Sequence, residues 1–276
     1  MSNGYYRPSG FGGLTPVVKN LLIINALFFL GTFSLLSFSR GQIDLTEWLA
    51  LYYPASDKFR TWQIVTYMFM HANFAHIFFN MFALWMFGNI LEQVWGPKRF
   101  LTYYLVTGIG AAIVHILVMY YQFWTLDAEV SRFISHPNPV DFEMLIEKYF
   151  AGMYNPLWLQ EMVNAWSLSP HDAGMTHEAM QAIGKLISTK MDIPTVGASG
   201  AVFGILLAYG MLFPNTLLYI YFLFPIKAKW FVIIYGALEF YFGISGHGDN
   251  VAHFAHLGGM IFGYFMIRRW RRHMYY

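Results

Sequence analysis

Gly197-Ala198-Ser199-Gly200 opens an apolar segment that runs on to Phe213, and it places one hydroxyl between glycines at the start of a helix. Ala255-His256-Leu257-Gly258-Gly259 places a histidine beside small residues in a later apolar segment, and His71 to Asn80 leads into an earlier one. Polar side chains are costly inside hydrocarbon, so they mark a functional site by default. The three stretches therefore predict helices that enter a bilayer and a polar site among them.

The composition is typical of a helical membrane protein. Hydrophobic residues make up 57% of the chain and charged residues 12%, whereas a soluble domain carries about 25% charged residues. The chain has no cysteine, which excludes disulfides and cysteine-based metal sites. Lys19 and Asn20 lead directly into an apolar span without a small-residue cleavage site near its end, so we expect no cleavable signal peptide.

Six apolar segments are predicted to cross the membrane, which makes the expected fold an all-α bundle of six transmembrane helices. A full crossing needs about 20 residues, so the fourth and fifth segments are short for it. Leu217–Phe224 is too short to span and is predicted to be a connector or re-entrant piece before Pro225, or an early start to the fifth helix. The predicted spans are Leu21–Phe38, Ala75–Trp95, Phe100–Gln122, Ala198–Phe213, Ala228–Phe242 and Val251–Ile267.

The charge distribution predicts the orientation of the bundle. Basic residues gather in the N-terminal arm, the second and fourth interhelical loops and the C-terminal tail, whereas most acids lie on the other side. The positive-inside rule then puts both termini in the cytoplasm. Since no organellar targeting segment is apparent, we expect a bacterial inner (plasma) membrane. The basic residues are Arg7, Lys19, Lys98, Arg99, Lys227, Lys229, Arg268, Arg269, Arg271 and Arg272.

A long insert, residues 125–195, separates the third and fourth spans of what we expect to be a single membrane domain over residues 1–276. The insert holds most of the acids of the chain. Asp141–Met153 and Thr176–Lys190 have helical spacing with one apolar face each. We therefore expect an extracytoplasmic subdomain of short helices on the membrane face, with a generic loop as the alternative.

Ser199 is the candidate nucleophile. Gly197 and Gly200 allow a tight backbone turn and leave the hydroxyl uncrowded. Because Ser199 opens a helix, nearby N–H groups have no intrahelical partner and point toward incoming negative charge, as an oxyanion hole requires. Taken alone, the motif more often marks a serine that caps a helix.

His256 is the candidate general base. It shares one helix face with small residues, and the helix of Ser199 offers a matching face, so the two helices are expected to approach closely. Close approach is what a Ser–His hydrogen bond between helices needs. His253 is a rival for this role, and an interhelical hydrogen bond without chemistry is the alternative. The small residues on the two faces are Ala252, Gly259 and Gly263, and Gly200 and Gly204.

His76 and Asn80 lie one turn apart on the second span, hence on one face, and Asn73 extends the same stripe. The side chains of His76 and Asn80 can each donate a hydrogen bond, which makes them candidate oxyanion-hole donors. The alternative is that they hold helices together, a common role for these residue types in membranes. His71 is expected at the helix entrance in a structural role.

In their order and spans, these motifs resemble those of the rhomboid intramembrane serine proteases. The motifs are His71-x4-His76-x3-Asn80, the GxSG around Ser199, and Ala255-His256-x2-Gly259-x3-Gly263. The resemblance covers nearly the whole chain except the insert. It implies a six-span rhomboid-like bundle that hydrolyses peptide bonds inside the membrane.

The resemblance also implies the role of each residue. Ser199 would be the nucleophile and His256 the general base, a dyad without an aspartate. His76, Asn80 and the Ser199 backbone N–H would form the oxyanion hole, and His71 would support the fold. Phe203 stands where the family often has a tyrosine packed against the catalytic histidine. Gly197, Gly200 and Gly259 are the other supporting residues.

The implied substrates are single-span membrane proteins cut within the lipid bilayer, and we expect no cofactor, metal ion or nucleic acid. Helix carbonyls are hydrogen-bonded internally, so small or helix-breaking residues are expected near the cut. Water must reach Ser199, and the resemblance suggests the fifth span as a movable lateral gate. The aromatic residues of this span are Trp230, Phe231, Tyr235 and Phe242.

Two other functions compete with the protease. A transporter, or a protein that handles haem or metal ions, would use the intramembrane histidines as a proton relay or as ligands. Carboxylates are scarce for such a relay, because Glu239 is the only acid well inside a predicted span. The H-E-x-x-H of a membrane zinc protease does not occur. A non-catalytic scaffold for client helices would not need the complete set of motifs, so the sequence favours the protease.

Overall fold

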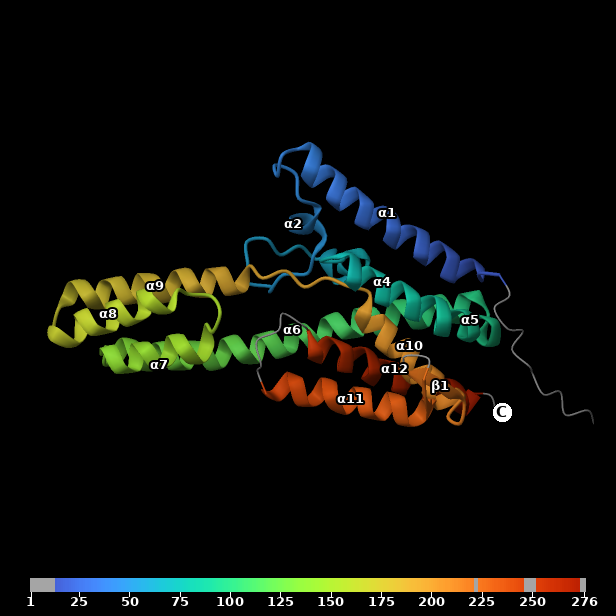
Figure 1. Ribbon diagram of the computed structural model, residues 1–276. Coiled ribbons are helices and arrows are strands. Elements are labelled where there is room, and N and C mark those ends of the chain that lie inside the picture. The colour runs from blue at the N-terminus through green and yellow to red at the C-terminus, as the bar shows by residue number, and fades with distance from the viewer. Residues whose placement is uncertain (1–12, 221–222, 246–251, 274–276) are drawn as a thin grey trace, which may run out of the picture.

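The computed structural model describes residues 13–220, 223–245 and 252–273, and most of them lie in helices (Figure 1). Among the sequence predictions, Arg7 and the start of the sixth span at Val251 fall outside these ranges. The helices and turns are α1 (Pro16–Phe38), α2 (Leu45–Leu49), α3 (Gln63–Thr66), the 3-10 turn η1 (Tyr67–Phe69), α4 (Phe74–Ala83), the π-helical turn η2 (Leu84–Gly88), α5 (Asn89–Trp95), α6 (Pro97–Ser135), α7 (Pro139–Tyr149), α8 (Pro156–Leu168), α9 (Ala173–Met191), α10 (Ser199–Leu212), α11 (Ala228–Ser245) and α12 (His253–His273). Two short strands, β1 (Leu217–Ile220) and β2 (Phe224–Lys227), lie between α10 and α11.

Each of the six predicted spans coincides with a helix or a continuous helical run. Three are long and apolar enough to cross a membrane, namely Pro16–Phe38, Phe74–Trp95 and Pro97–Ser135. α10 is apolar but has only 14 residues, as the sequence predicts for a short fourth span. The chain is therefore a mainly helical membrane protein, and the crossing of the bilayer by α10, α11 and α12 stays a prediction.

α10 forms the centre of the bundle, where it packs against α6 and α12 (Figure 1). Gly204 of α10 lies so close to Thr107 of α6 that a Cβ added at position 204 would be only 2.7 Å from the threonine Cβ. The Tyr103 hydroxyl donates to the Gly204 carbonyl at 2.8 Å. Most of α10 is buried by protein, which is the condition under which non-helical backbone at the ends of a short span is tolerated at membrane depth.

Glu92 of α5 is a buried carboxylate that holds the start of α1. It accepts hydrogen bonds from the backbone N–H groups of Val17 and Val18 at 3.0 and 2.9 Å and from the Thr15 hydroxyl at 2.6 Å. The Asn89 Oδ1 accepts a hydrogen bond from the Thr15 backbone N–H at 2.9 Å and shares the single proton of the Thr15 hydroxyl with Glu92. The first N–H groups of a helix have no intrahelical partner and favour a negative charge nearby, so Glu92 joins α1 to the second span.

The third span is the start of a longer helix, because α6 continues past Gln122 to Ser135 before the chain turns. At 1.5 Å per residue, this 39-residue helix is about 58 Å long, roughly twice the thickness of the hydrocarbon core. Its last turns pack with α7, α8 and α9 around a separate apolar core. These elements form a lobe that projects away from the bundle (Figure 1).

Three helices rather than two follow α6 in the lobe. The predicted helices Asp141–Met153 and Thr176–Lys190 correspond to α7 and α9, whereas α8 was not expected. Its buried residues recur at i, i+3, i+4 and i+7, which is the signal for an amphipathic helix. These residues are Leu159, Met162, Val163 and Trp166.

The predicted connector Leu217–Phe224 belongs to a β-hairpin and is not an early turn of the fifth helix. β1 and β2 pair antiparallel, with Leu217 opposite Lys227 and Ile220 opposite Phe224. The hairpin lets the two segments satisfy each other's backbone groups, which matters for any non-helical segment close to a membrane.

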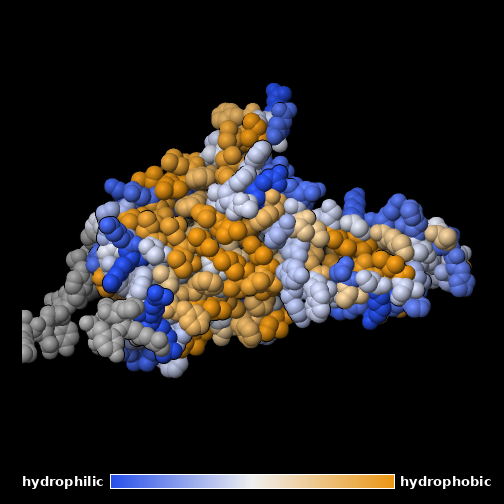
Figure 2. Space-filling model, turned by 180° about the vertical axis from the view of Figure 1, so that it is seen from behind, coloured by the Kyte–Doolittle hydropathy of each residue, from blue (hydrophilic) through white to orange (hydrophobic). Residues whose placement is uncertain are grey.

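The surface of the bundle is largely apolar (Figure 2). Large hydrophobic side chains are exposed on α1, α4 and α11, including Leu27, Phe79 and Ile233. The lobe shows more polar surface in the same view (Figure 2). An exposed apolar surface of this extent is typical of a protein that contacts lipid.

Candidate active site

Ser199 and His256 lie at hydrogen-bond distance from each other. Ser199 is the first residue of α10, and His256 lies in the first turn of α12. The Ser199 Oγ and the His256 Nε2 are 2.8 Å apart. A serine hydroxyl next to a buried imidazole nitrogen is the arrangement in which a histidine can take the hydroxyl proton.

Two glycines bring these helices together. The carbonyl oxygen of Gly200 lies in the space that a side chain at position 259 would need, and Gly200 itself faces Ala111 of α6. Gly200 directly follows Ser199, and Gly259 lies one turn after His256. The two small-residue faces therefore meet beside the site, and a larger residue at position 259 would push Ser199 and His256 apart.

The Phe203 ring covers one face of the His256 imidazole. The ring centroids are 4.2 Å apart and the planes differ by 6°. Tyr235 of α11 packs on Phe203 in turn, with centroids 4.8 Å apart. The contact with His256 uses the ring alone, so a phenolic hydroxyl is not needed for it.

A carboxylate joins His256, although the resemblance implies a serine–histidine pair without an acid. The Glu239 Oε2 of α11 is 2.8 Å from the His256 Nδ1 and 2.7 Å from the His253 Nδ1. All three side chains are buried, with 6, 8 and 9% exposure for Glu239, His256 and His253. In the sequence, Glu239 stands out only because it is the one acid well inside a predicted span. An isolated acid in an apolar helix needs a polar partner, and this was the available signal that Glu239 belongs to the site.

His76 lies beside the backbone that leads into Ser199. Gly197 has a φ of +131°, and an added Cβ there would be 2.8 Å from the Cε1 and Nε2 of His76. The Gly197 N–H donates to the Tyr67 carbonyl at 2.9 Å. Glycine at this position therefore allows both the backbone turn and the approach of the imidazole.

Asn80, His71 and Asn73 gather around His76. The Asn80 Nδ2 donates to the His76 carbonyl one turn earlier at 2.9 Å, and the amide has a second N–H beyond that one. The buried His71 ring meets the His76 ring edge-on, with centroids 5.1 Å apart. Asn73 caps α4 by accepting from the His76 N–H at 2.9 Å. Through His76, this polar stripe of the second span reaches the turn at Gly197.

His115 of α6, which the sequence leaves without a role, has a structural partner close by. Its Nε2 is 2.8 Å from the Thr195 Oγ1. Thr195 also pairs with Leu51 through two backbone hydrogen bonds of 2.9 and 2.8 Å. These contacts tie α6 and the first loop to the segment that leads into Ser199.

Glu239, His253 and His256 are also a group that could hold a metal ion. Their ligand atoms lie within 4.8 Å of one another. Carboxylate oxygen and imidazole nitrogen are common ligands of zinc and of other divalent ions. The Nδ1 atoms of His253 and His256 both face the Glu239 Oε2. A metal ion bound here would take the place of the two protons that form these hydrogen bonds.

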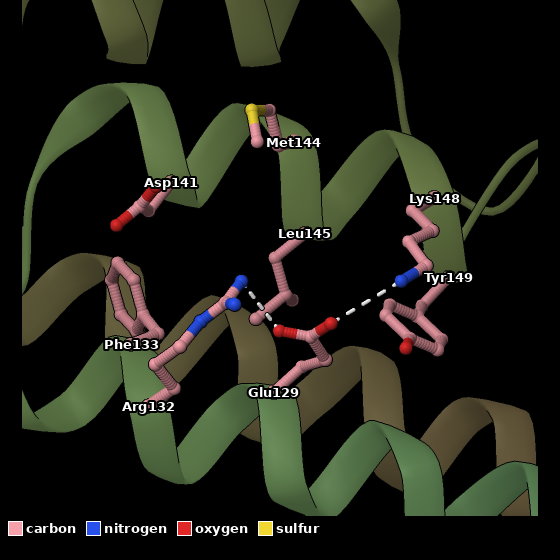
Figure 3. A pocket seen from close by; sticks show the side chains of 8 residues that line it. All are labelled: Glu129, Arg132, Phe133, Asp141, Met144, Leu145, Lys148 and Tyr149. Carbon is pink, nitrogen blue, oxygen red and sulfur yellow. Dashed lines mark hydrogen bonds and ion pairs between the residues drawn. The ribbon is translucent and has the colours of Figure 1, made fainter.

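A surface depression lies in the lobe, between α6 and α7 (Figure 3). Glu129 of α6 is 2.6 Å from Arg132 on the same helix, and it is 3.2 Å from Lys148 on α7 across the depression (Figure 3). Both basic side chains are largely exposed, and exposed ion pairs contribute little stability. The depression is therefore a solvated charged surface, separate from the serine and histidine of the bundle.

The bundle and its part-buried contact between Ser199 and His256 define a helical membrane protein with a polar site among its helices. A family model of the Rhomboid domain matches residues 58–125 and 165–272, which together are well over half of the chain. The protein therefore belongs to the rhomboid family. The unmatched residues 126–164 include the end of α6, all of α7 and much of α8, so most of the lobe lies outside the matched family domain.

Several relatives fit this family. An uncharacterised mitochondrial rhomboid protein of Schizosaccharomyces pombe is 26% identical over 79% of this chain and 53% of its own length. The rhomboid protease GluP of Bacillus subtilis is 40% identical over 19% of this chain and 10% of its own length. The rhomboid protease GlpG of Yersinia pestis is 29% identical over 25% of each chain. The chain thus spans about half the length of the first relative and smaller parts of the other two.

Proposed function

We propose that the protein is an intramembrane serine endopeptidase that cleaves transmembrane segments of single-span membrane proteins in the bilayer. Ser199 is the nucleophile and His256 the general base. The observation that carries this proposal is the 2.8 Å contact between the Ser199 Oγ and the His256 Nε2. The named proteases among the relatives support the same class of enzyme.

The proposed reaction starts at this contact. As the Ser199 Oγ attacks the scissile carbonyl carbon, its proton passes to the His256 Nε2 and the carbonyl electron pair moves onto oxygen. The C–N bond then breaks, and the leaving amine takes the proton from Nε2. A water molecule attacks the acyl-enzyme with His256 again as base, which releases the new carboxyl end and restores Ser199.

His76, Asn80 and the Ser199 backbone N–H are proposed to stabilise the oxyanion. The His76 ring lies beside Gly197, Asn80 has a second amide N–H, and Ser199 begins α10. The first N–H groups of a helix point toward incoming negative charge. One oxyanion donor is worth about 10²–10³ in kcat.

Five further residues are proposed to hold this geometry without supplying chemistry. Gly197 permits the approach of the oxyanion-hole histidine, and Gly200 and Gly259 permit the approach of α10 and α12. Phe203 packs flat on the catalytic imidazole, and the His71 ring supports its neighbour on α4 edge-on.

Substrate is proposed to reach Ser199 from the bilayer through movement of α11. This helix packs on α10 and α12 and presents aromatic side chains outward. Trp230, Tyr235 and Phe242 are 51, 38 and 40% exposed. A helical substrate has its carbonyls hydrogen-bonded internally, so small or helix-breaking residues at the cut are expected to favour cleavage.

The proposed orientation puts both termini in the cytoplasm and the lobe on the opposite side of the membrane. In this proposal one rhomboid-type domain runs through the chain, with residues 125–195 as an extracytoplasmic insert. A bacterial plasma membrane is the proposed location, while the relatives include proteins named as mitochondrial and chloroplastic.

Labelling with a fluorophosphonate probe in liposomes tests the proposal. Wild type should be labelled, whereas Ser199→Ala and His256→Ala should not. Ser135→Ala is the matched control, because it removes an exposed serine of α6 and should keep full labelling. Cleavage of a transmembrane model substrate rich in small residues, with product masses, then establishes peptide-bond hydrolysis. Equal labelling or turnover by Ser199→Ala would contradict the mechanism.

A metal-handling role is a second candidate, because the ligand atoms of Glu239, His253 and His256 lie within 4.8 Å of one another. This role predicts stoichiometric metal in the purified protein and its loss in Glu239→Gln. The protease proposal predicts instead that EDTA leaves Ser199-dependent turnover unchanged. Elemental analysis beside an activity assay in EDTA separates the two.

A further inference from the structure

Glu239 can act on the reaction through His256. Two contacts of 2.8 Å form a continuous line, from the Ser199 Oγ to the His256 Nε2 and from the His256 Nδ1 to the Glu239 Oε2. We infer that Glu239 is a positioning residue that completes a Ser–His–Glu triad with Ser199 and His256. This inference rests on the proposed protease function, and it adds a third residue to the proposed pair.

The carboxylate determines which nitrogen of His256 carries the proton. An ionised carboxylate can only accept hydrogen bonds, so the His256 Nδ1 must donate. The neutral imidazole then has its lone pair on Nε2, the atom that faces the Ser199 hydroxyl. Without Glu239 the two tautomers would compete, and only one of them can accept the serine proton.

Glu239 also stabilises the charge that forms during the reaction. Transfer of the Ser199 proton makes His256 an imidazolium, and a lone cation in a buried site is unfavourable. The neighbouring carboxylate turns that cation into an ion pair whose geometry exists before the reaction starts, so little reorganisation is needed. The proton moves between Ser199, His256 and the leaving amine, and Glu239 stays ionised throughout.

His253 holds the carboxylate in place. Its Nδ1 is 2.7 Å from the same Oε2, and its ring stands at 89° to that of His256 with centroids 6.5 Å apart. Two N–H donors on one oxygen compensate for the burial of its negative charge. With Phe203 stacked on the imidazole face, these contacts restrict rotation of the His256 ring.

The test must separate positioning from packing, because Glu239 also joins α11 to α12. Glu239→Gln keeps the volume and one acceptor but removes the charge. In liposomes with a transmembrane model substrate, we expect its kcat to fall by about 10²–10⁴-fold with KM nearly unchanged. Glu239→Asp should regain part of kcat.

Glu92→Gln is the matched control, because it removes a second buried carboxylate, one that contacts the start of α1. It should lower thermal stability and leave kcat close to the wild-type value. Ser199→Ala, assayed in parallel, reports on the proposed function itself. Wild-type kcat in Glu239→Gln, with Ser199→Ala inactive, would overturn the triad and leave the protease proposal unaffected.

The tautomer can be read without turnover. In ¹⁵N-histidine NMR spectra, with signals assigned by His256→Ala, wild-type His256 should show the Nδ1–H form and Glu239→Gln a mixture of forms. The same tautomer in both proteins would overturn the inference. Wild-type turnover by Ser199→Ala would overturn the proposed function instead, and the spectra would still decide whether Glu239 sets the proton on His256.

Discussion

The carbonyl oxygen of Gly200 lies in the space where any residue other than glycine at position 259 would place its Cβ. This contact sets the spacing of α10 and α12 directly beside Ser199 and His256. Because a hydrogen bond weakens beyond about 3.2 Å, a small increase in that spacing is enough to break the Ser–His contact.

Gly259→Ala is therefore expected to lower turnover and probe labelling by about 10²-fold, the cost of a misplacement of about 1 Å at a reacting group. Initial rates and labelling kinetics measure the change. Gly184→Ala on α9 is the control, because an added Cβ there meets open space and should leave activity unchanged. Full activity of Gly259→Ala would show that the helices can separate without loss of the contact.

Asn80→Ala is expected to reduce kcat by about 10²–10³-fold with little change in KM, because an oxyanion donor acts mainly in the transition state. Steady-state kinetics on a transmembrane model substrate measure both constants. Asn73→Ala should instead weaken the cap of α4, at a cost of about 1 kcal/mol in stability, with a far smaller effect on kcat. A change in KM alone would make Asn80 a packing residue.

Phe203→Leu is expected to lower kcat by a few-fold to about tenfold, equivalent to the loss of an aromatic contact of about 0.5–1.5 kcal/mol. The physical reason is that one face of the His256 imidazole loses its stacking partner. Phe78→Leu on the exposed surface of α4 is the control and should retain wild-type kcat. Equal rates for the two variants would remove Phe203 from the supporting set.

Glu92→Gln is expected to destabilise the protein by about 1–3 kcal/mol, since hydrogen bonds to a buried charge are lost at the start of α1. Thermal unfolding in detergent measures the effect. Glu147→Gln on the exposed surface of α7 should leave the unfolding temperature unchanged. If both variants unfold at the wild-type temperature, α1 is held by its apolar contacts alone.

Much of the fold could be predicted because bilayer helices depend on local composition. An apolar run must satisfy its backbone groups within itself in hydrocarbon, so α1, the second span and α6 could be located without knowledge of their neighbours. The segment that forms β1 and β2 was predicted as a connector but not as a hairpin, since a short apolar and aromatic run does not show its strand pairing until the partner strand is known. The length of α6 was also underestimated, because its last turns pack in the lobe rather than in lipid.

The sequence by itself determined the membrane class, the positions of the six helices and the candidate pair of Ser199 and His256. Only the tertiary structure decided that these two residues, 57 positions apart, meet at 2.8 Å. It also decided that Glu239, 17 positions before His256 and on another helix, reaches its Nδ1. The physical reason is that local composition selects helices, whereas the partner of a buried charge depends on how two helices pack.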